Sequence, residues 1–157
     1  MCFLDLVGYT RLTEERGDAA AADLAGSLAG VVQGVSQRHG GRPVKWLGDG
    51  VMFYFPDPAR AVRSSLEMVR ETGSAGLPPA HVGLHAGPVV QQDGDYFGRT
   101  VNLASRVAGR AGAGEVLVTD DIVEVAGEID GVEFADAGSA ELKNVSRPVR
   151  LWRAVPS

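Results

Sequence analysis

Val44-Lys45-Trp46-Leu47-Gly48-Asp49-Gly50 is followed directly by Val51-Met52-Phe53-Tyr54-Phe55, so two apolar runs flank a Gly-Asp-Gly tip. An Asp-Gly pair between two strand-like runs is a strong signal for a β-hairpin. Glycine adopts positive φ at little steric cost, which lets the chain reverse tightly. Taken alone, the stretch predicts a surface hairpin with Asp49 at its tip and Lys45 as an isolated charge on one strand.

Outward from this hairpin, the apolar residues follow strand and helix periods in turn. Strands are expected at Met1–Val7, Pro43–Phe55 (the hairpin), His81–Val90, Glu115–Thr119, Phe134–Asn144 and Val149–Val155, and helices after a Thr10 cap and at Ala19–Arg38, Ala59–Thr72, Thr100–Ala111 and Asp120–Ala126. Gln91–Gly98 is expected to be a polar connector. This order predicts an α+β fold, with a ferredoxin-like βαββαβ core, an added αβ unit and a C-terminal hairpin.

Length and composition indicate one globular domain over residues 1–157. The net charge is 15 − 20 = −5, which argues against a general nucleic-acid surface, because phosphate binding needs clustered Lys and Arg. Cys2 is the only cysteine, so no internal disulfide forms, and we expect a cytoplasmic location. The apolar runs fall short of the ~20 residues that span a bilayer, so we expect no direct membrane contact from this segment. A strand at the first residue suggests a piece of a longer protein.

Two acidic residues are candidates for metal binding. Asp5 lies in the first predicted strand and Asp49 at the hairpin tip, and these strands commonly lie close together in a ferredoxin-like sheet. Converging carboxylates repel each other unless a divalent cation joins them, and oxygen ligands suit Mg²⁺ or Mn²⁺. Gly8-Tyr9-Thr10 follows Asp5 as a glycine turn into a helix, which can bind an anion through backbone N–H groups. The alternative is two unrelated turn aspartates.

Three further polar residues are candidates for binding a phosphorylated ligand. Asn102 and Arg106 lie four residues apart, so they share one helix face. Arginine offers a planar fork to phosphate oxygens, and asparagine can hydrogen-bond a hydroxyl group. Lys143 is an isolated cation near the end of a late strand. For each of these residues alone, a place on a solvated surface is the favoured interpretation.

Four motifs occur in an order that is far more specific than any one of them. They are Phe3-Leu4-Asp5-Leu6-Val7-Gly8-Tyr9-Thr10, Val44–Gly50, Val82–Val89 and Gly94–Arg106. Together they resemble the catalytic domain of the class III adenylyl and guanylyl cyclases. The resemblance extends from Phe3 to the Val149–Val155 region, which is nearly the whole chain.

The resemblance implies a role for each candidate residue. Asp5 and Asp49, with the Leu6 carbonyl, match the ligands of two divalent cations, Mg²⁺ or Mn²⁺, and the turn of Gly8, Tyr9 and Thr10 matches a phosphate cradle. The pair that reads the purine is matched by Lys45 and Asp95, and the catalytic pair by Asn102 and Arg106. Lys143 matches a lysine that binds the terminal phosphates. Asn144 departs from the glycine usual after this lysine, which puts the role of Lys143 in doubt.

The implied activity is an adenylyl cyclase that acts on ATP, because guanylyl cyclases of this family usually have Glu where this chain has Lys45. The implied assembly is a head-to-tail homodimer with two shared sites. The alternatives are a guanylyl or dual-specificity cyclase, or a silent nucleotide-binding module, which would be expected to lack a metal Asp, the Asn or the Arg. We expect His39, His81 and His85 to be structural, and Trp46 to lie in the core or at a dimer contact.

Overall fold

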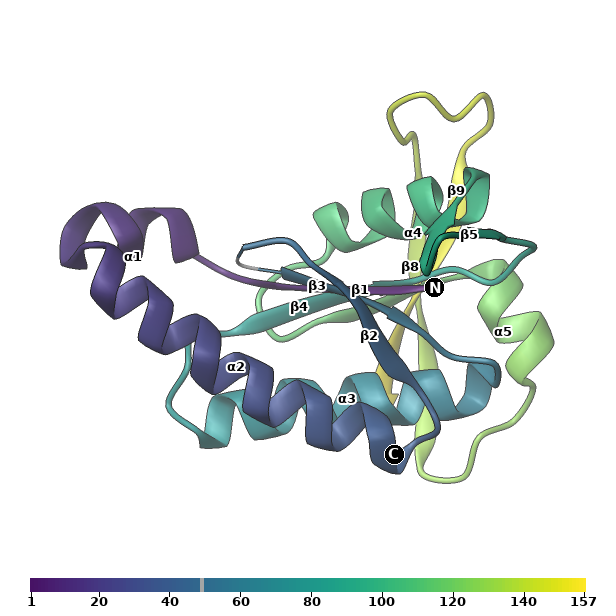
Figure 1. The fold of residues 1–157 in the computed structure, drawn as a ribbon. Coiled ribbons are helices and arrows are strands. Elements are labelled where there is room, and N and C mark those ends of the chain that lie inside the picture. The colour runs from purple at the N-terminus through teal and green to yellow at the C-terminus, as the bar shows by residue number, and fades with distance from the viewer. Residues whose placement is uncertain (49) are drawn as a thin grey trace.

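The computed structural model describes residues 1–48 and 50–157, so the predicted metal ligand Asp49 lies outside the described residues. Seven strands form one mixed sheet, and a separate two-stranded hairpin accompanies it (Figure 1). The elements in chain order are β1 Cys2–Leu6, α1 Tyr9–Arg16, α2 Asp18–Arg38, β2 Arg42–Trp46, β3 Gly50–Tyr54, α3 Pro58–Ser74, β4 Ala80–Leu84, β5 Val90–Gln92, β6 Asp95–Phe97, α4 Arg99–Arg110, β7 Val116–Thr119, α5 Asp120–Ala126, β8 Val132–Ala140 and β9 Val149–Pro156.

The strand order of the large sheet is β2-β3-β1-β4-β7-β9-β8. Its first four strands have the order of a ferredoxin-like sheet, with β1 antiparallel to both β3 and β4. The added unit joins through β7, which runs parallel to β4, and the chain closes with the antiparallel pair β8 and β9. The predicted α+β fold class and ferredoxin-like core are confirmed.

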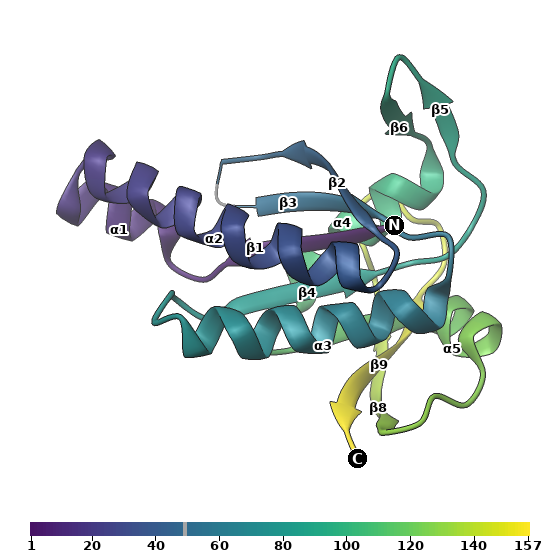
Figure 2. The same cartoon turned by 60° about the horizontal axis from the view of Figure 1, so that its bottom comes forward.

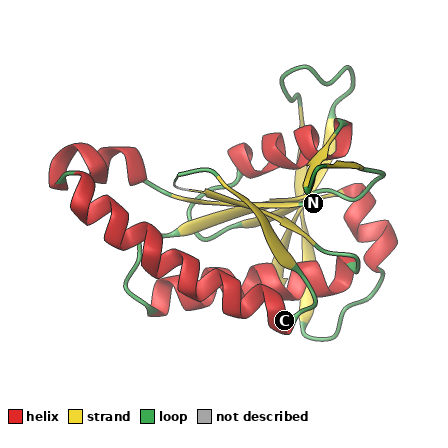
Figure 3. Cartoon of the chain, in the orientation of Figure 1, coloured by secondary structure: helices red, strands yellow, loops and turns green. Residues whose placement is uncertain are grey.

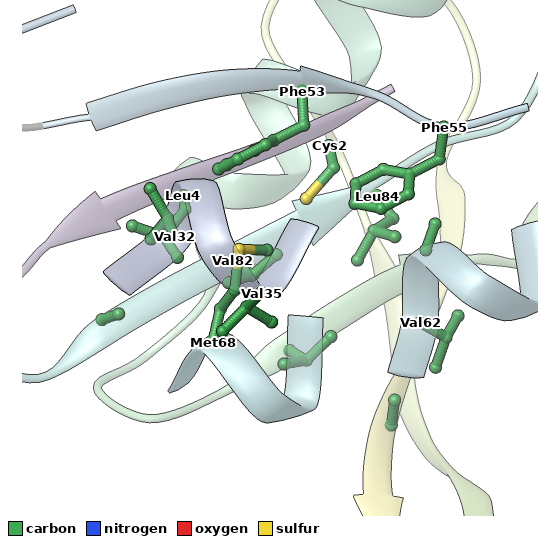
Figure 4. Packing of buried hydrophobic residues seen from close by; sticks show 14 of the residues in the cluster. Cys2, Leu4, Val32, Val35, Phe53, Phe55, Val62, Met68, Val82 and Leu84 are labelled. Carbon is green, nitrogen blue, oxygen red and sulfur yellow. The ribbon is translucent and has the colours of Figure 1, made fainter. Parts of the chain in front are cut away.

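Helices cover both faces of the sheet, with α2 and α3 on one face and α4 on the other (Figure 1). The α2–α3 side holds the main core, where Val35 of α2 lies beside Met68 of α3 (Figure 4); Val32 and Val62 belong to the same cluster. On the other face, Ala104 and Ala108 of α4 pack in a smaller cluster. A side chain at Gly83 of β4 would collide with the backbone of α4, so this glycine lets the helix lie directly on the sheet.

Alternation along β1 divides the core from the opposite face. Cys2, Leu4 and Leu6 point into the main core, whereas Phe3 belongs to the cluster beneath α4. Because successive side chains of a strand point to opposite faces, Asp5 lies on the α4 side with Phe3. The apolar residues at even positions therefore bury one face of β1 and leave the carboxylate of Asp5 outside the main core.

The segment from 81 to 97 differs from the sequence prediction. The predicted strand His81–Val90 ends at Leu84, and the predicted connector contains the antiparallel hairpin of β5 and β6. Asp93 has φ 53° and Gly94 has φ 79°, the two positive φ values of a type I′ hairpin turn. Figure 2 shows this hairpin extending beyond the main sheet, and Figure 3 shows the loop that leads to it.

The strand predicted at Phe134–Asn144 is also displaced, because β8 begins at Val132 and ends at Ala140. This early end leaves residues 141–148 as a connection between the last two strands.

None of the described helices is both long and apolar enough to cross a bilayer.

Removing the aromatic ring at the centre of the core should destabilise the fold. Phe53 is 0% exposed, so Phe53→Ala leaves a cavity and is expected to lower the free energy of unfolding by about 3–5 kcal/mol. Val125 is 63% exposed, and Val125→Ala is the control, expected to change the same quantity by about 0.5 kcal/mol or less. Denaturant unfolding measures both, and equal effects would contradict this placement of the core.

Candidate functional site

Asp5 is held at a close crossing between β1 and β3. It lies opposite Gly50 in the antiparallel register and is half-buried. A Cβ atom at position 50 would collide with the Asp5 carboxylate and lie 2.9 Å from the Leu4 carbonyl oxygen. Glycine at position 50 therefore provides the space in which this carboxylate sits, one residue after the predicted second ligand at position 49.

The turn after β1 exposes the first N–H groups of α1. Gly8 is the N-cap, with φ 76°, and none of the described side chains caps this end of the helix. The Tyr9 hydroxyl donates a hydrogen bond to the Ala21 carbonyl at 3.1 Å, which ties α1 to α2. The predicted Thr10 cap is wrong, because the left-handed Gly8 begins the helix two residues earlier. The uncapped N–H groups can donate hydrogen bonds to an anion.

Oxygen donors at this end of β1 fit a hard divalent cation. The Asp5 carboxylate has its own space against Gly50, and Leu6 ends the strand one residue later. Carboxylate and carbonyl oxygens are what Mg²⁺ and Mn²⁺ prefer. Within residues 1–48 and 50–157 there is no group of three or more His, Cys, Asp or Glu placed to hold a metal. The described oxygens at this end of β1 therefore suit a divalent cation, and the predicted ligand Asp49 lies outside the described residues.

Lys45 and Asp95 lie in direct contact, although they are far apart in the sequence. The Lys45 ammonium donates to Asp95 Oδ2 at 3.0 Å, and the Tyr96 backbone N–H donates to Asp95 Oδ1 at 2.8 Å. The hydrogen bond from Lys45, followed by that from Tyr96, lowers the pKa of the Asp95 carboxyl below its usual value. Both side chains keep part of their surface exposed, so a ligand can reach a donor and an acceptor side by side.

Asn102, Arg106 and Lys143 line one cavity of about 380 Å³. The first two come from α4, and Lys143 comes from the connection between β8 and β9. Arg99, at the start of α4, also lines the cavity, and none of the described lining residues is a carboxylate. Three cations around a hollow without a nearby acid favour an anionic ligand, and arginine binds phosphate through paired hydrogen bonds.

Asn144, which stands where the family usually has glycine, adopts a backbone conformation that glycine favours. Asn144 has φ 64°, in the left-handed region where glycine is favoured. Asparagine is among the few other residues that adopt this conformation readily. The backbone turn that glycine would make is therefore kept, and Lys143 still reaches the cavity.

Sequence analysis missed Arg99, although it lies three residues before Asn102 and seven before Arg106, a spacing that puts all three on one helix face.

The predicted site residues do not gather around one hollow. Asp5, Lys45 and Asp95 are absent from the lining of the cavity that holds Arg106 and Lys143. Figures 1 and 2 place α1 and the β5–β6 hairpin at opposite ends of the molecule.

The remaining single-residue predictions have mixed outcomes. His85 is buried, as predicted, and its Nδ1 lies 2.8 Å from Thr119 Oγ1, while burial lowers its pKa. His81 Nδ1 lies 2.7 Å from the Ala108 carbonyl oxygen. Trp46 is 47% exposed, so its predicted place in the core is wrong because it lies on edge strand β2. The dimer contact remains a prediction.

Comparison with known proteins identifies the family. The family model described as the adenylate and guanylate cyclase catalytic domain matches residues 1–152. The chain belongs to this family. Among curated relatives of this cyclase domain, a pH-sensitive adenylate cyclase from Mycobacterium tuberculosis is 38% identical over 160 residues, covering 98% of the chain. An adenylate cyclase from Streptomyces coelicolor is 36% identical over 123 residues, covering 78% of the chain.

The cyclase domain spans 39% of the length of the mycobacterial relative and 32% of the length of the Streptomyces one. Among solved structures, the adenylyl cyclase CyaB from P. aeruginosa is similar with a TM-score of 0.84 and 28% identity, over 99% of this chain and 92% of that chain. The guanylyl cyclase Cya2 is similar in fold, with a TM-score of 0.80 and 21% identity, over 99% of this chain and 90% of that chain.

Replacing Lys45 should raise the pKa of Asp95. In Lys45→Met the largest cause of the lowered pKa is lost, while the Tyr96 N–H still donates, so the carboxyl pKa should move part of the way towards its usual value. Because the folded pKa is below the unfolded one, the contribution to stability is present above the unfolded pKa and is lost as pH falls through the folded pKa. NMR titration of the Asp95 side-chain carboxyl carbon measures the shift, and Arg150→Met should leave it unchanged.

Proposed function

We propose that this cyclase domain converts ATP to 3′,5′-cyclic AMP and pyrophosphate. The reaction is an attack by the ribose 3′-hydroxyl oxygen on the α-phosphorus, with loss of the bond to the β-phosphate and release of the hydroxyl proton. The observation that carries the choice of ATP is the contact between Lys45 and Asp95. The adenylate cyclase names of the relatives from Mycobacterium tuberculosis and Streptomyces coelicolor support it.

The purine preference follows from hydrogen-bond polarity. Adenine presents ring-nitrogen acceptors beside an exocyclic amine donor, which complement the Lys45 ammonium and the Asp95 carboxylate. Guanine presents a carbonyl oxygen and a ring N–H at the corresponding positions, so each group would meet the wrong polarity. A site that hydrogen-bonds one pattern rejects the other strongly, because the wrong base leaves polar groups unpaired.

Phosphate binding is assigned to the cavity lined by Arg106 and Lys143. Arg106 would neutralise the charge that develops on the α-phosphoryl oxygens, and loss of such a donor typically costs ~10²–10³-fold in rate. Lys143 would bind the terminal phosphates, and Asn102 would orient the ribose. Phosphoryl transfer depends mainly on such positioning and charge neutralisation, so these side chains account for much of the catalysis.

The metal-binding part of the proposed active site would lie at the end of β1. Asp5 and the Leu6 carbonyl, together with Asp49, would hold two divalent cations, Mg²⁺ or Mn²⁺. When bound, the ions would lower the pKa of the attacking hydroxyl and neutralise the leaving phosphates. The N–H groups of Gly8, Tyr9 and Thr10, where α1 begins, would bind phosphate oxygens beside them.

A head-to-tail homodimer would complete the site. The phosphate-binding turn at α1 and the base-reading pair at β6 lie at opposite ends of one chain (Figures 1 and 2), and Asp5 does not line the cavity of Arg106. A twofold axis brings the same two surfaces together twice. Each of the two sites would then take its metal ligands from one copy and its base-reading and catalytic residues from the other.

Cyclic AMP production tests the activity. With Mg²⁺ or Mn²⁺, the chain is expected to form cyclic AMP from ATP with a higher kcat/KM than it forms cyclic GMP from GTP, when the two substrates compete. Asp5→Ala is expected to abolish turnover and to leave the circular dichroism spectrum and dimer unchanged. A higher kcat/KM for GTP would identify a guanylyl cyclase, and tight ATP binding by a folded dimer without product would identify a silent nucleotide-binding module.

Mixing two inactive variants tests the shared site. Asp5→Ala removes a metal ligand and Arg106→Ala removes a catalytic cation, so each homodimer should be inactive. After random exchange of subunits, half of the dimers are mixed, and each keeps one intact site out of two. About one quarter of the wild-type activity should return. An equally mixed sample that stays inactive would contradict the shared site.

A further inference from the structure

Three side chains beside the base-reading pair form a compact group, which we call the tyrosine clamp: Arg42 of β2, Tyr54 of β3 and Tyr96 of β6. The two tyrosine rings are stacked, with centroids 4.8 Å apart and planes 4° apart. The Arg42 guanidinium lies 5.7 Å from each ring centroid and donates a hydrogen bond to the Tyr96 hydroxyl at 2.6 Å. Tyr96 is only 6% exposed and Tyr54 is half-buried, whereas Arg42 is exposed, so the clamp is packed on its tyrosine side.

A β-bulge aligns the clamp with the base-reading lysine. Arg42 pairs with Tyr54, Pro43 with Phe53, and Lys45 with Met52, so two residues of β2 stand opposite one step of β3. In a regular strand, residues three apart point to opposite faces. The extra residue reverses this parity and puts Arg42 and Lys45 on the same face, which is how bulges near functional sites redirect a side chain.

Strands β2 and β6 are joined both by the Arg42–Tyr96 contact of the clamp and by the Lys45–Asp95 contact. Tyr96 directly follows Asp95, and its backbone N–H donates to Asp95 Oδ1 at 2.8 Å. Arg42 therefore holds β6 through the Tyr96 hydroxyl, and Lys45 holds it through Asp95 Oδ2. The β5–β6 hairpin is separate from the main sheet, so these two contacts with β2 act together with the packing of Tyr96 against Tyr54 to hold the Asp95 carboxylate in place.

We propose that Arg42 and Tyr96 are positioning residues that set the purine selectivity of the site through the placement of Asp95 and Lys45. This inference rests on the proposed function, since it assumes that this pair reads the base. Base reading requires donor and acceptor to match the purine edge to within about 0.5 Å. Loss of the bond between Arg42 and Tyr96 removes one of the contacts that hold β6 against β2 and leaves the Tyr96 hydroxyl without this partner.

Binding of nucleotides that cannot react tests this independently of turnover. 3′-Deoxy-ATP and 3′-deoxy-GTP lack the attacking hydroxyl, so their Kd values report recognition alone. In Arg42→Met and in Tyr96→Phe, the ratio of the GTP-analogue Kd to the ATP-analogue Kd is expected to fall by about 3- to 10-fold, the range of one hydrogen bond. The double variant should resemble either single one, because all three lose the same bond.

Two further variants separate positioning from a general structural role. Arg42→Lys keeps a donor and should restore part of the selectivity. Arg150→Met is the matched control, because Arg150 also lies over an aromatic ring, that of Trp152 at 4.5 Å, and pairs with Asp136 at 3.2 Å. It lies on β9, outside the clamp and the base-reading pair, and should leave the Kd ratio unchanged.

The outcomes distinguish this inference from the proposed function. Wild-type chain that prefers the ATP analogue but forms no cyclic AMP overturns the proposed activity, while the Kd ratios of the variants still test the clamp. Active wild-type chain whose clamp variants lose thermal stability but keep the Kd ratio overturns the positioning role. Wild-type chain without preference between the analogues overturns both base reading by Lys45 and Asp95 and its control by the clamp.

Discussion

The structure depends on the central strand β1, which is paired on both edges and covered on both faces. Its even-numbered residues belong to the main core, and Phe3 belongs to the cluster beneath α4. A strand with a period of two can serve a core and a site at once, because each face has its own set of residues. Asp5 consequently lies on a rigid element, and the absence of a side chain at Gly50 leaves room for its carboxylate.

Two hairpins bring the base-reading pair together at the edge of this sheet. The β2–β3 hairpin contributes Lys45, and the β5–β6 hairpin contributes Asp95. The ion pair alone is partly exposed and would be weak in isolation, since exposed pairs contribute little to stability. The stacked tyrosines and Arg42 add a part-buried contact that joins β2 and β3 to β6, so an aromatic group supports a polar pair that keeps part of its surface exposed.

The charged residues of the predicted site lie on separate surfaces of the chain, as the proposed shared site would require. Arg99, Arg106 and Lys143 gather around one cavity without a described carboxylate in its lining, whereas Asp5 lies on β1 beside the turn that begins α1. Cationic side chains attract phosphate, and carboxylates attract metal ions. If the two kinds of side chain lay in contact within one subunit, they would pair with each other. Keeping them on separate surfaces preserves both for a ligand that two copies would share.

Apolar periodicity and four ordered motifs are local properties of the chain, so the order of the main-sheet elements, the ferredoxin-like core and the family could be predicted from the sequence. The sequence also contains a hairpin-turn signal at Asp93-Gly94, inside the segment predicted to be a polar connector. The folded chain shows, as local patterns could not, that Arg42 and Lys45 share a face, because a single bulge reverses strand parity. It also shows that Tyr96 joins Tyr54 and that Arg99 joins the cavity of Arg106 and Lys143, since such contacts depend on packing between distant segments.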